Sequence, residues 1–93
     1  SLTADLCKAN NIKLAVNNTF MSPFGQTPLK LGADVVMHSA TKFIGGHSDL
    51  IAGALITNDT DMAEQLQFIQ KSGGAIPSPF DCWILLRSTK TMA

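Results

Sequence analysis

Three apolar runs without polar alternation are the feature that most limits how this 93-residue chain can fold. The runs are Ile-Lys-Leu-Ala-Val at 12–16, Ala-Asp-Val-Val-Met at 33–37 and Leu-Ile-Ala-Gly-Ala-Leu-Ile-Thr at 50–57. Short runs of this kind are typical of strands with both faces covered. Amphipathic patterns at 2–9 and 61–72 predict helices, and Ser-Pro-Phe-Asp at 78–81 is a helix start, while residues 17–28 read as an ordered loop. The sequence therefore predicts an α/β fold with one sheet.

Both ends of the chain have the pattern of an interior segment. Ser1 leads directly into the first helical pattern, and the final residues, Cys-Trp-Ile-Leu-Leu-Arg-Ser-Thr-Lys-Thr-Met-Ala, carry no helix stop such as a glycine. We expect residues 1–93 to be one partial domain of a longer chain.

The charge balance argues against several classes of partner. Seven basic residues face seven acidic ones, so no long-range field favours nucleic acid or an anionic membrane. The longest apolar run is far shorter than a bilayer span. Cys7 and Cys82 fit no CxxC spacing and are typical of buried thiols in a reducing compartment. We expect a cytoplasmic protein, with an organelle as the alternative, and no nucleic-acid or membrane partner.

The stretch 38–49, His-Ser-Ala-Thr-Lys-Phe-Ile-Gly-Gly-His-Ser-Asp, follows the second predicted strand. Ser39 and Thr41 can present both hydroxyls to one side of an extended segment, and the glycine pair 45–46 lets backbone approach a ligand closely. Lys42 becomes a nucleophile when it is desolvated or placed beside other positive groups. Hydroxyls for a phosphate and a lysine for an aldehyde are what a pyridoxal 5'-phosphate (PLP) enzyme needs. On spacing alone, a solvated lysine beside a turn also fits.

Residues 34–49 closely resemble the cofactor-lysine signature of the Cys/Met-metabolism (transsulfuration) family of PLP enzymes, which includes cystathionine lyases, cystathionine synthases and methionine lyase. Residues 17–24, Asn-Asn-Thr-Phe-Met-Ser-Pro-Phe, are similar to that family's Asp-Asn-Thr-Phe loop, and residues 76–93 to the helix that follows. The resemblance implies that residues 1–93 are an internal fragment of an aspartate-aminotransferase-like PLP-enzyme large domain.

The resemblance also implies the roles of four residues. Lys42 would be the Schiff-base lysine and the base that moves the substrate's α-proton, and Ser39 and Thr41 would bind the cofactor phosphate. Asn17 stands where the family has an aspartate facing the pyridine nitrogen. A carboxylate keeps that nitrogen protonated, whereas an asparagine can only hydrogen-bond it.

The function implied in this way is that of a PLP-dependent carbon–sulfur lyase, a cystathionine beta- or gamma-lyase acting on a small-molecule amino acid. A cystathionine synthase, a methionine lyase and a non-catalytic paralogue that keeps the fold are the alternatives. The family resemblance further implies a homo-oligomer, a tetramer.

The remaining polar and aromatic residues are expected to be structural. His38 and His47 have no third ligand at metal spacing, so we predict no metal site. Phe80 and Trp83 are expected to pack in a core rather than against a cofactor. Arg87 is expected to be structural or solvated.

Overall fold

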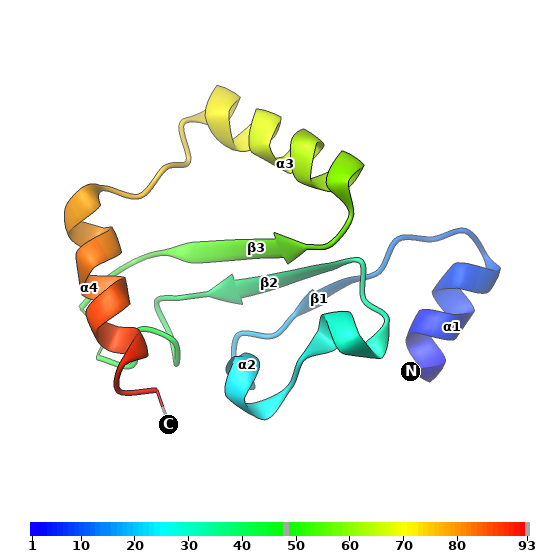
Figure 1. The fold of residues 1–93 in the computed structure, drawn as a ribbon, viewed down its shortest axis with the longest axis horizontal. Helices are drawn as coiled ribbons and strands as arrows, with labels where there is room; N and C mark the ends of the chain where they lie inside the picture. Colours follow the sequence, from blue (N-terminus) through cyan, green and yellow to red (C-terminus); the bar gives the residue numbers. More distant parts are fainter. Residues whose placement is uncertain (48, 93) are drawn as a thin grey trace.

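The computed structural model describes residues 1–47 and 49–92, so Ser48 of the lysine stretch and Ala93 lie outside the described residues (Figure 1). Its elements are α1 (Leu2–Ala9), β1 (Ala15–Asn17), α2 (Ser22–Gly25), the 3-10 helix η1 (Pro28–Leu31), β2 (Val35–Ser39), β3 (Gly53–Thr57), α3 (Thr60–Gly73) and α4 (Pro79–Thr89). The three strands form one sheet in the order β1-β2-β3. The predicted α/β fold with a single sheet is confirmed.

The strand directions bring three chain segments to one end of the sheet. β1 and β2 are parallel, with Asn17 opposite Met37, and β2 and β3 are antiparallel, with Ser39 opposite Gly53. The carboxyl ends of β1 and β2 and the amino end of β3 therefore lie at the same end of the sheet, and α4 lies beside that end in Figure 1. In open α/β sheets, ligands bind outside the carboxyl ends of the parallel strands.

The two long helices begin and end at residues whose side chains suit those positions. Asp59 accepts a hydrogen bond from the backbone N–H of Met62 at 3.2 Å and caps α3, which ends at Gly74 in the left-handed conformation, φ 73°. Ser78 accepts a hydrogen bond from the N–H of Asp81 at 3.1 Å and caps α4. The helix start predicted at Ser78 is therefore confirmed.

The segment predicted as an ordered loop, residues 17–28, contains the short helix α2, and the 3-10 helix η1 begins at its last residue; each has a proline in its first turn. Proline presets the helical φ, which explains why these turns form where polar residues predicted loop. The buried amide of Asn18 holds the segment together, because its Nδ2 donates to the carbonyls of Ser22 (3.1 Å) and Gln26 (2.9 Å).

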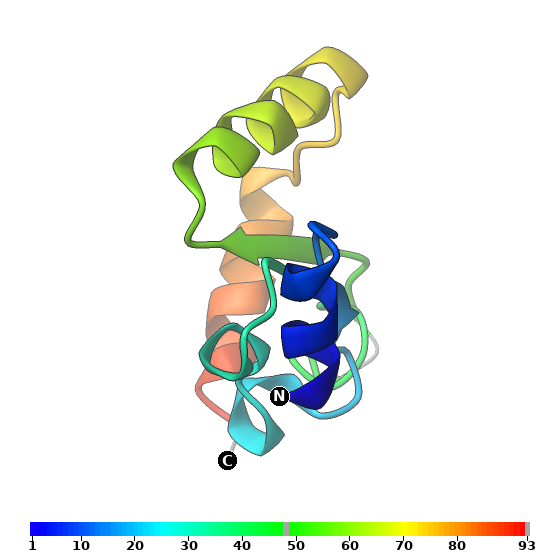
Figure 2. The ribbon, with the colours of Figure 1, turned by 90° about the vertical axis from the view of Figure 1, so that its right-hand side faces the viewer.

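The buried apolar core is small. Its members are Ala4, Val36, Ala40, Leu50 and Ile84. The chain exposes 6715 Å², whereas a compact monomer of 9.9 kDa exposes about 5,200 Å². Figure 2 shows why: α3 lies beyond the β3 edge instead of across a face of the sheet. The expectation that both strand faces are covered is not met within this chain.

Phe80 and Trp83 correct a second expectation. The two residues are 66% and 60% exposed, so the prediction that they pack in a core is wrong for these 93 residues. The two rings instead lie beside each other on α4, with centroids 6.1 Å apart. The reason is the same as for the sheet, since the described chain supplies no further layer over this helix.

Within the described residues, none of the helices combines the length and the apolar character needed to cross a bilayer.

Candidate functional site

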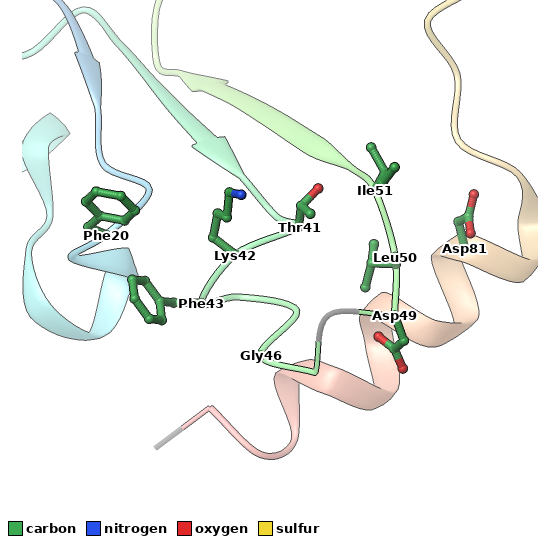
Figure 3. Close-up of a pocket in the computed structure, with 9 residues that line it drawn as sticks. All are labelled: Phe20, Thr41, Lys42, Phe43, Gly46, Asp49, Leu50, Ile51 and Asp81. Carbon is green, nitrogen blue, oxygen red and sulfur yellow. The ribbon is translucent and has the colours of Figure 1, made fainter.

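A pocket of about 860 Å³ lies at the end of the sheet where β1 and β2 end and β3 begins, and Lys42 lines it (Figure 3). Its lining comes from the turn after β1, the segment between β2 and β3, and the first turn of α4. The lining residues are Phe20, Thr41, Lys42, Phe43, Gly46, Asp49, Leu50, Ile51 and Asp81. This volume is within the range of small-molecule sites.

The turn that carries Lys42 is held by backbone hydrogen bonds directly after β2. The N–H of Lys42 donates to the carbonyl of Ser39 at 3.2 Å, and the N–H of Gly46 donates to the carbonyl of Lys42 at 2.7 Å. Gly46 has a φ of +71°, a conformation that suits glycine. The turn leaves the Lys42 side chain exposed at the pocket.

Gly45 is required by a close approach of the chain to itself. Its N–H donates to the carbonyl oxygen of Ala40 at 2.8 Å, and a Cβ added at residue 45 would lie 2.6 Å from that oxygen. Leu50 closes the other side, with Cδ2 3.2 Å from the same position. The sequence analysis attributed the glycine pair 45–46 to close approach of a ligand. At residue 45, the close approach is to the backbone of Ala40 within the turn itself.

The two hydroxyls predicted to bind a phosphate are placed differently. Thr41 lines the pocket, and its Oγ1 accepts from the N–H of Ala52 at 3.0 Å and donates to the Ala52 carbonyl over a long 3.4 Å. Ser39 is half-buried at the end of β2 and is not among the pocket-lining residues. Its N–H donates to Oγ1 of Thr19 at 2.9 Å.

Asn17 lies at the end of β1, outside the lining of the pocket, and is joined to Ser39 through Thr19. Oδ1 of Asn17 accepts from the N–H of Thr19 at 3.2 Å and from its hydroxyl at 2.6 Å. Two donors at one oxygen identify that atom as the amide carbonyl. The amide Nδ2 is therefore the polar atom of Asn17 available to a ligand.

Asp49 and Arg87 form an ion pair at the edge of the pocket, with Nη2 of Arg87 2.5 Å from Oδ2 of Asp49. The hydrogen bond from Arg87 is the main cause that holds the pKa of the Asp49 carboxyl below its usual value near 3.8. Asp49 is therefore ionised at neutral pH. Arg87, which was expected to be structural or solvated, thus pairs with a residue that lines the pocket.

Sequence reasoning missed several pocket residues. The rings of Phe20 and Phe43 meet edge to face with centroids 5.7 Å apart, although both are largely exposed. Asp49 and Asp81 enter the same pocket from segments 32 positions apart, by the difference of their residue numbers. Phe43 is next to Lys42 in the sequence, and Asp49 and Asp81 lie in motifs identified there, but nothing in the sequence indicated that the two aspartates share a pocket.

The histidines lie apart from any ligand cluster. His38 is buried in β2, and His47 places Nδ1 2.7 Å from the carbonyl oxygen of Gly45. In residues 1–47 and 49–92, no three potential metal ligands lie close enough to hold one ion.

The chain thus has an open α/β sheet with a lysine-containing pocket at the carboxyl ends of its parallel strands, the position at which open α/β sheets bind ligands. Comparison with known proteins gives the family. The profile of the Cys/Met metabolism PLP-dependent enzymes matches residues 1–93, and the chain belongs to that family. The resemblance identified from the lysine signature is confirmed.

Relatives with different reactions are similar to this chain. A probable cystathionine gamma-synthase of Herpetosiphon aurantiacus is 49% identical over 88 residues, which are 95% of this chain and 28% of the relative. A cystathionine beta-lyase of Staphylococcus haemolyticus is 54% identical over 89 residues, 96% of this chain and 23% of the relative.

Solved structures of the same group share the fold. The crystal structure of cystathionine gamma-lyase from Lactobacillus plantarum, complexed with L-serine, matches with a TM-score of 0.94 and 40% identity, over 98% of this chain and 24% of that one. The chain thus spans about a quarter of the length of these relatives.

Proposed function

We propose that the full protein is a PLP-dependent carbon–sulfur lyase of sulfur amino-acid metabolism, a cystathionine beta- or gamma-lyase. The observation that carries the proposal is the position of Lys42 in a pocket at the carboxyl ends of β1 and β2. The chain that contains this pocket belongs to the Cys/Met metabolism PLP-dependent enzymes. The substrate would be a small-molecule amino acid. A homo-oligomer, a tetramer by family resemblance, is part of the same proposal.

The pocket fits the cofactor by size and by donor set. A volume of about 860 Å³ accommodates a small aromatic phosphate ester, and the pocket offers an amine, a hydroxyl and two aromatic rings. In the pocket, Lys42 would hold the aldehyde and Thr41 the phosphate. Ser39 and Asn17 lie outside its lining, at the ends of β2 and β1, and would contact the phosphate and the pyridine nitrogen from there. When bound, the cofactor supplies an electron sink for bond breaking at the α-carbon of an amino acid.

The chain's own groups suit these tasks. The long 3.4 Å bond from Thr41 Oγ1 to Ala52 is easily exchanged for a donation to a phosphate oxygen, while the shorter bond from Ala52 N–H keeps the hydroxyl in place. Lys42 would take the α-proton of the substrate at Nζ and would supply a proton to the sulfur of the departing thiol.

Asn17 makes this site different in charge from one with an aspartate. Its Nδ2 can donate to an unprotonated pyridine nitrogen, but an amide carries no negative charge to keep that nitrogen protonated. A non-catalytic paralogue that keeps the fold is therefore the second candidate from another class. The relative named cystathionine gamma-synthase supports a third candidate, a synthase of the same family.

The test of the proposal is borohydride reduction of the full-length protein with PLP, followed by peptide mapping. We expect the reduced pyridoxyl group on Lys42, and no label in Lys42→Ala. A label on Lys30 or Lys71 instead would contradict the assignment.

Product analysis decides the reaction. A beta-lyase releases the three-carbon 2-oxo acid from cystathionine, and a gamma-lyase releases the four-carbon one. Formation of cystathionine from an activated homoserine and cysteine would identify a synthase, and a PLP-loaded protein that does none of these would identify a non-catalytic paralogue.

A further inference from the structure

Two carboxylates line the pocket together with Lys42, Asp49 from the segment before β3 and Asp81 from α4 (Figure 3). The proposed cofactor carries a phosphate, and unpaired carboxylates in the same pocket repel such an anion. A free carboxylate would also compete for the Lys42 ammonium as an ion-pair partner. A pocket with this lining therefore needs both negative charges to be offset.

Each carboxylate has a separate positive counterpart. Asp81 lies in the first turn of α4, where the unpaired N–H groups of the helix give a partial positive charge. Asp49 receives the hydrogen bond from Arg87, which is a permanent cation and lies 38 positions along the chain. The lowered pKa of Asp49 agrees with this contact.

We propose that Arg87 is an electrostatic positioning residue of the PLP site, which holds the Asp49 carboxylate and cancels its charge, so that the pocket accepts an anionic cofactor and Lys42 gains no carboxylate partner. This inference rests on the proposed function. Arg87 is not among the pocket-lining residues, so it acts through Asp49 and not by touching the cofactor.

Because the Asp49–Arg87 ion pair is exposed, its effect on PLP binding can be measured separately from any effect on folding. The side chains of Arg87 and Asp49 are 43% and 36% exposed, and ion pairs of that kind contribute little to folding. Loss of the pair should therefore leave the protein folded. Removing Arg87 alone uncovers a negative charge at the pocket, whereas removing the Asp49 charge alone uncovers a positive one, so the two substitutions have opposite signs for an anion.

The experiment measures the Kd of PLP for the full-length apoprotein by absorbance titration. We expect Arg87→Gln to weaken binding about two- to tenfold at low salt, because a unit charge across a hydrated pocket has an effect of this size. Asp49→Asn should bind PLP as tightly as the wild type or more tightly. The double variant Arg87→Gln, Asp49→Asn should return to near the wild-type Kd.

Three controls isolate the charge effect. Lys90→Gln removes one positive charge directly after the same helix, at a residue that neither lines the pocket nor pairs with Asp49, and should leave the Kd unchanged. Arg87→Lys keeps the charge and should stay within about twofold of the wild type. Pyridoxal, which lacks the phosphate, should respond less than PLP to Arg87→Gln, and added salt should reduce the PLP effect.

The opposite pattern would overturn the inference. If Arg87→Gln and Asp49→Asn weaken PLP binding alike and the double variant is no better, the pair is a tether and its charge is irrelevant. If Arg87→Lys weakens PLP binding as much as Arg87→Gln does, charge neutralisation of Asp49 is not the reason that Arg87 matters for binding. A wild-type protein that binds no PLP would instead refute the proposed function and, with it, this inference.

Discussion

Gly45→Ala in the full-length protein is expected to destabilise the turn that presents Lys42. The new Cβ would lie 2.6 Å from the carbonyl oxygen of Ala40, whereas even close C···O contacts between backbone groups are about 3.3 Å. The turn must therefore open by roughly 0.7 Å, which lengthens the 2.8 Å hydrogen bond from Gly45 N–H to the same oxygen. Ala40 is buried and Leu50 blocks the other direction, so neither neighbour can move freely.

Overpacking of this kind costs about 1–3 kcal/mol. Hydrogen exchange of the full-length apoprotein, read by mass spectrometry over residues 40–50, measures that cost directly. At 1.36 kcal/mol per decade, exchange of this segment should become about 5- to 150-fold faster than in the wild type, while the rest of the sheet changes less.

Gly73→Ala is the matched control. A Cβ at residue 73 would meet no atom within 4 Å, and the residue lies at the end of α3, where alanine favours the helix. Exchange in residues 40–50 should then equal that of the wild type. Equal exchange rates for Gly45→Ala and wild type would refute the argument that the turn is closed around residue 45.

Two further predictions follow from the site and from the exposed sheet. Asn17→Asp should raise the turnover of cystathionine at saturating PLP about 5- to 30-fold, because a charge-assisted bond to the ring nitrogen contributes roughly 1–2 kcal/mol more than a neutral one; an unchanged or lower steady-state rate would show that residue 17 does not face that nitrogen. The isolated 93-residue segment should bind PLP poorly and release no 2-oxo acid from cystathionine, because both edge strands of its sheet lack a partner and apolar residues of the sheet, such as Met37 and Leu55, are exposed; release faster than with free PLP would contradict this.

Local chemistry made much of the fold predictable. The Ser78 cap, the apolar runs and the glycine after α3 each act on neighbouring residues, so they determine a helix start, a strand or a helix end wherever the chain lies. The lysine stretch was predictable for the same reason. Lys42 and Thr41 share the pocket because they are neighbours on one turn.

What the sequence did not predict depends on contacts between distant segments. The antiparallel direction of β3 leaves no mark on its apolar pattern, and the Asp49–Arg87 pair joins residues 38 positions apart. An apolar pattern also indicates that a residue favours burial, but it does not show which other segment would cover that residue. Trp83 was therefore expected in a core, although it is exposed in this chain. Thr19, which joins Asn17 to Ser39, was missed because a threonine in a loop has no distinctive spacing.

The hydrogen bonds between Thr41 and Ala52 also affect the order in which the chain folds. They close the Lys42 segment between residues only 11 positions apart, and β2 and β3 continue from them as one antiparallel pair. Shorter closures lose less chain entropy and form sooner than pairings of higher sequence separation. We therefore expect the lysine turn to take shape early, before Arg87 arrives on α4, so that the helix docks onto a turn whose backbone is already set.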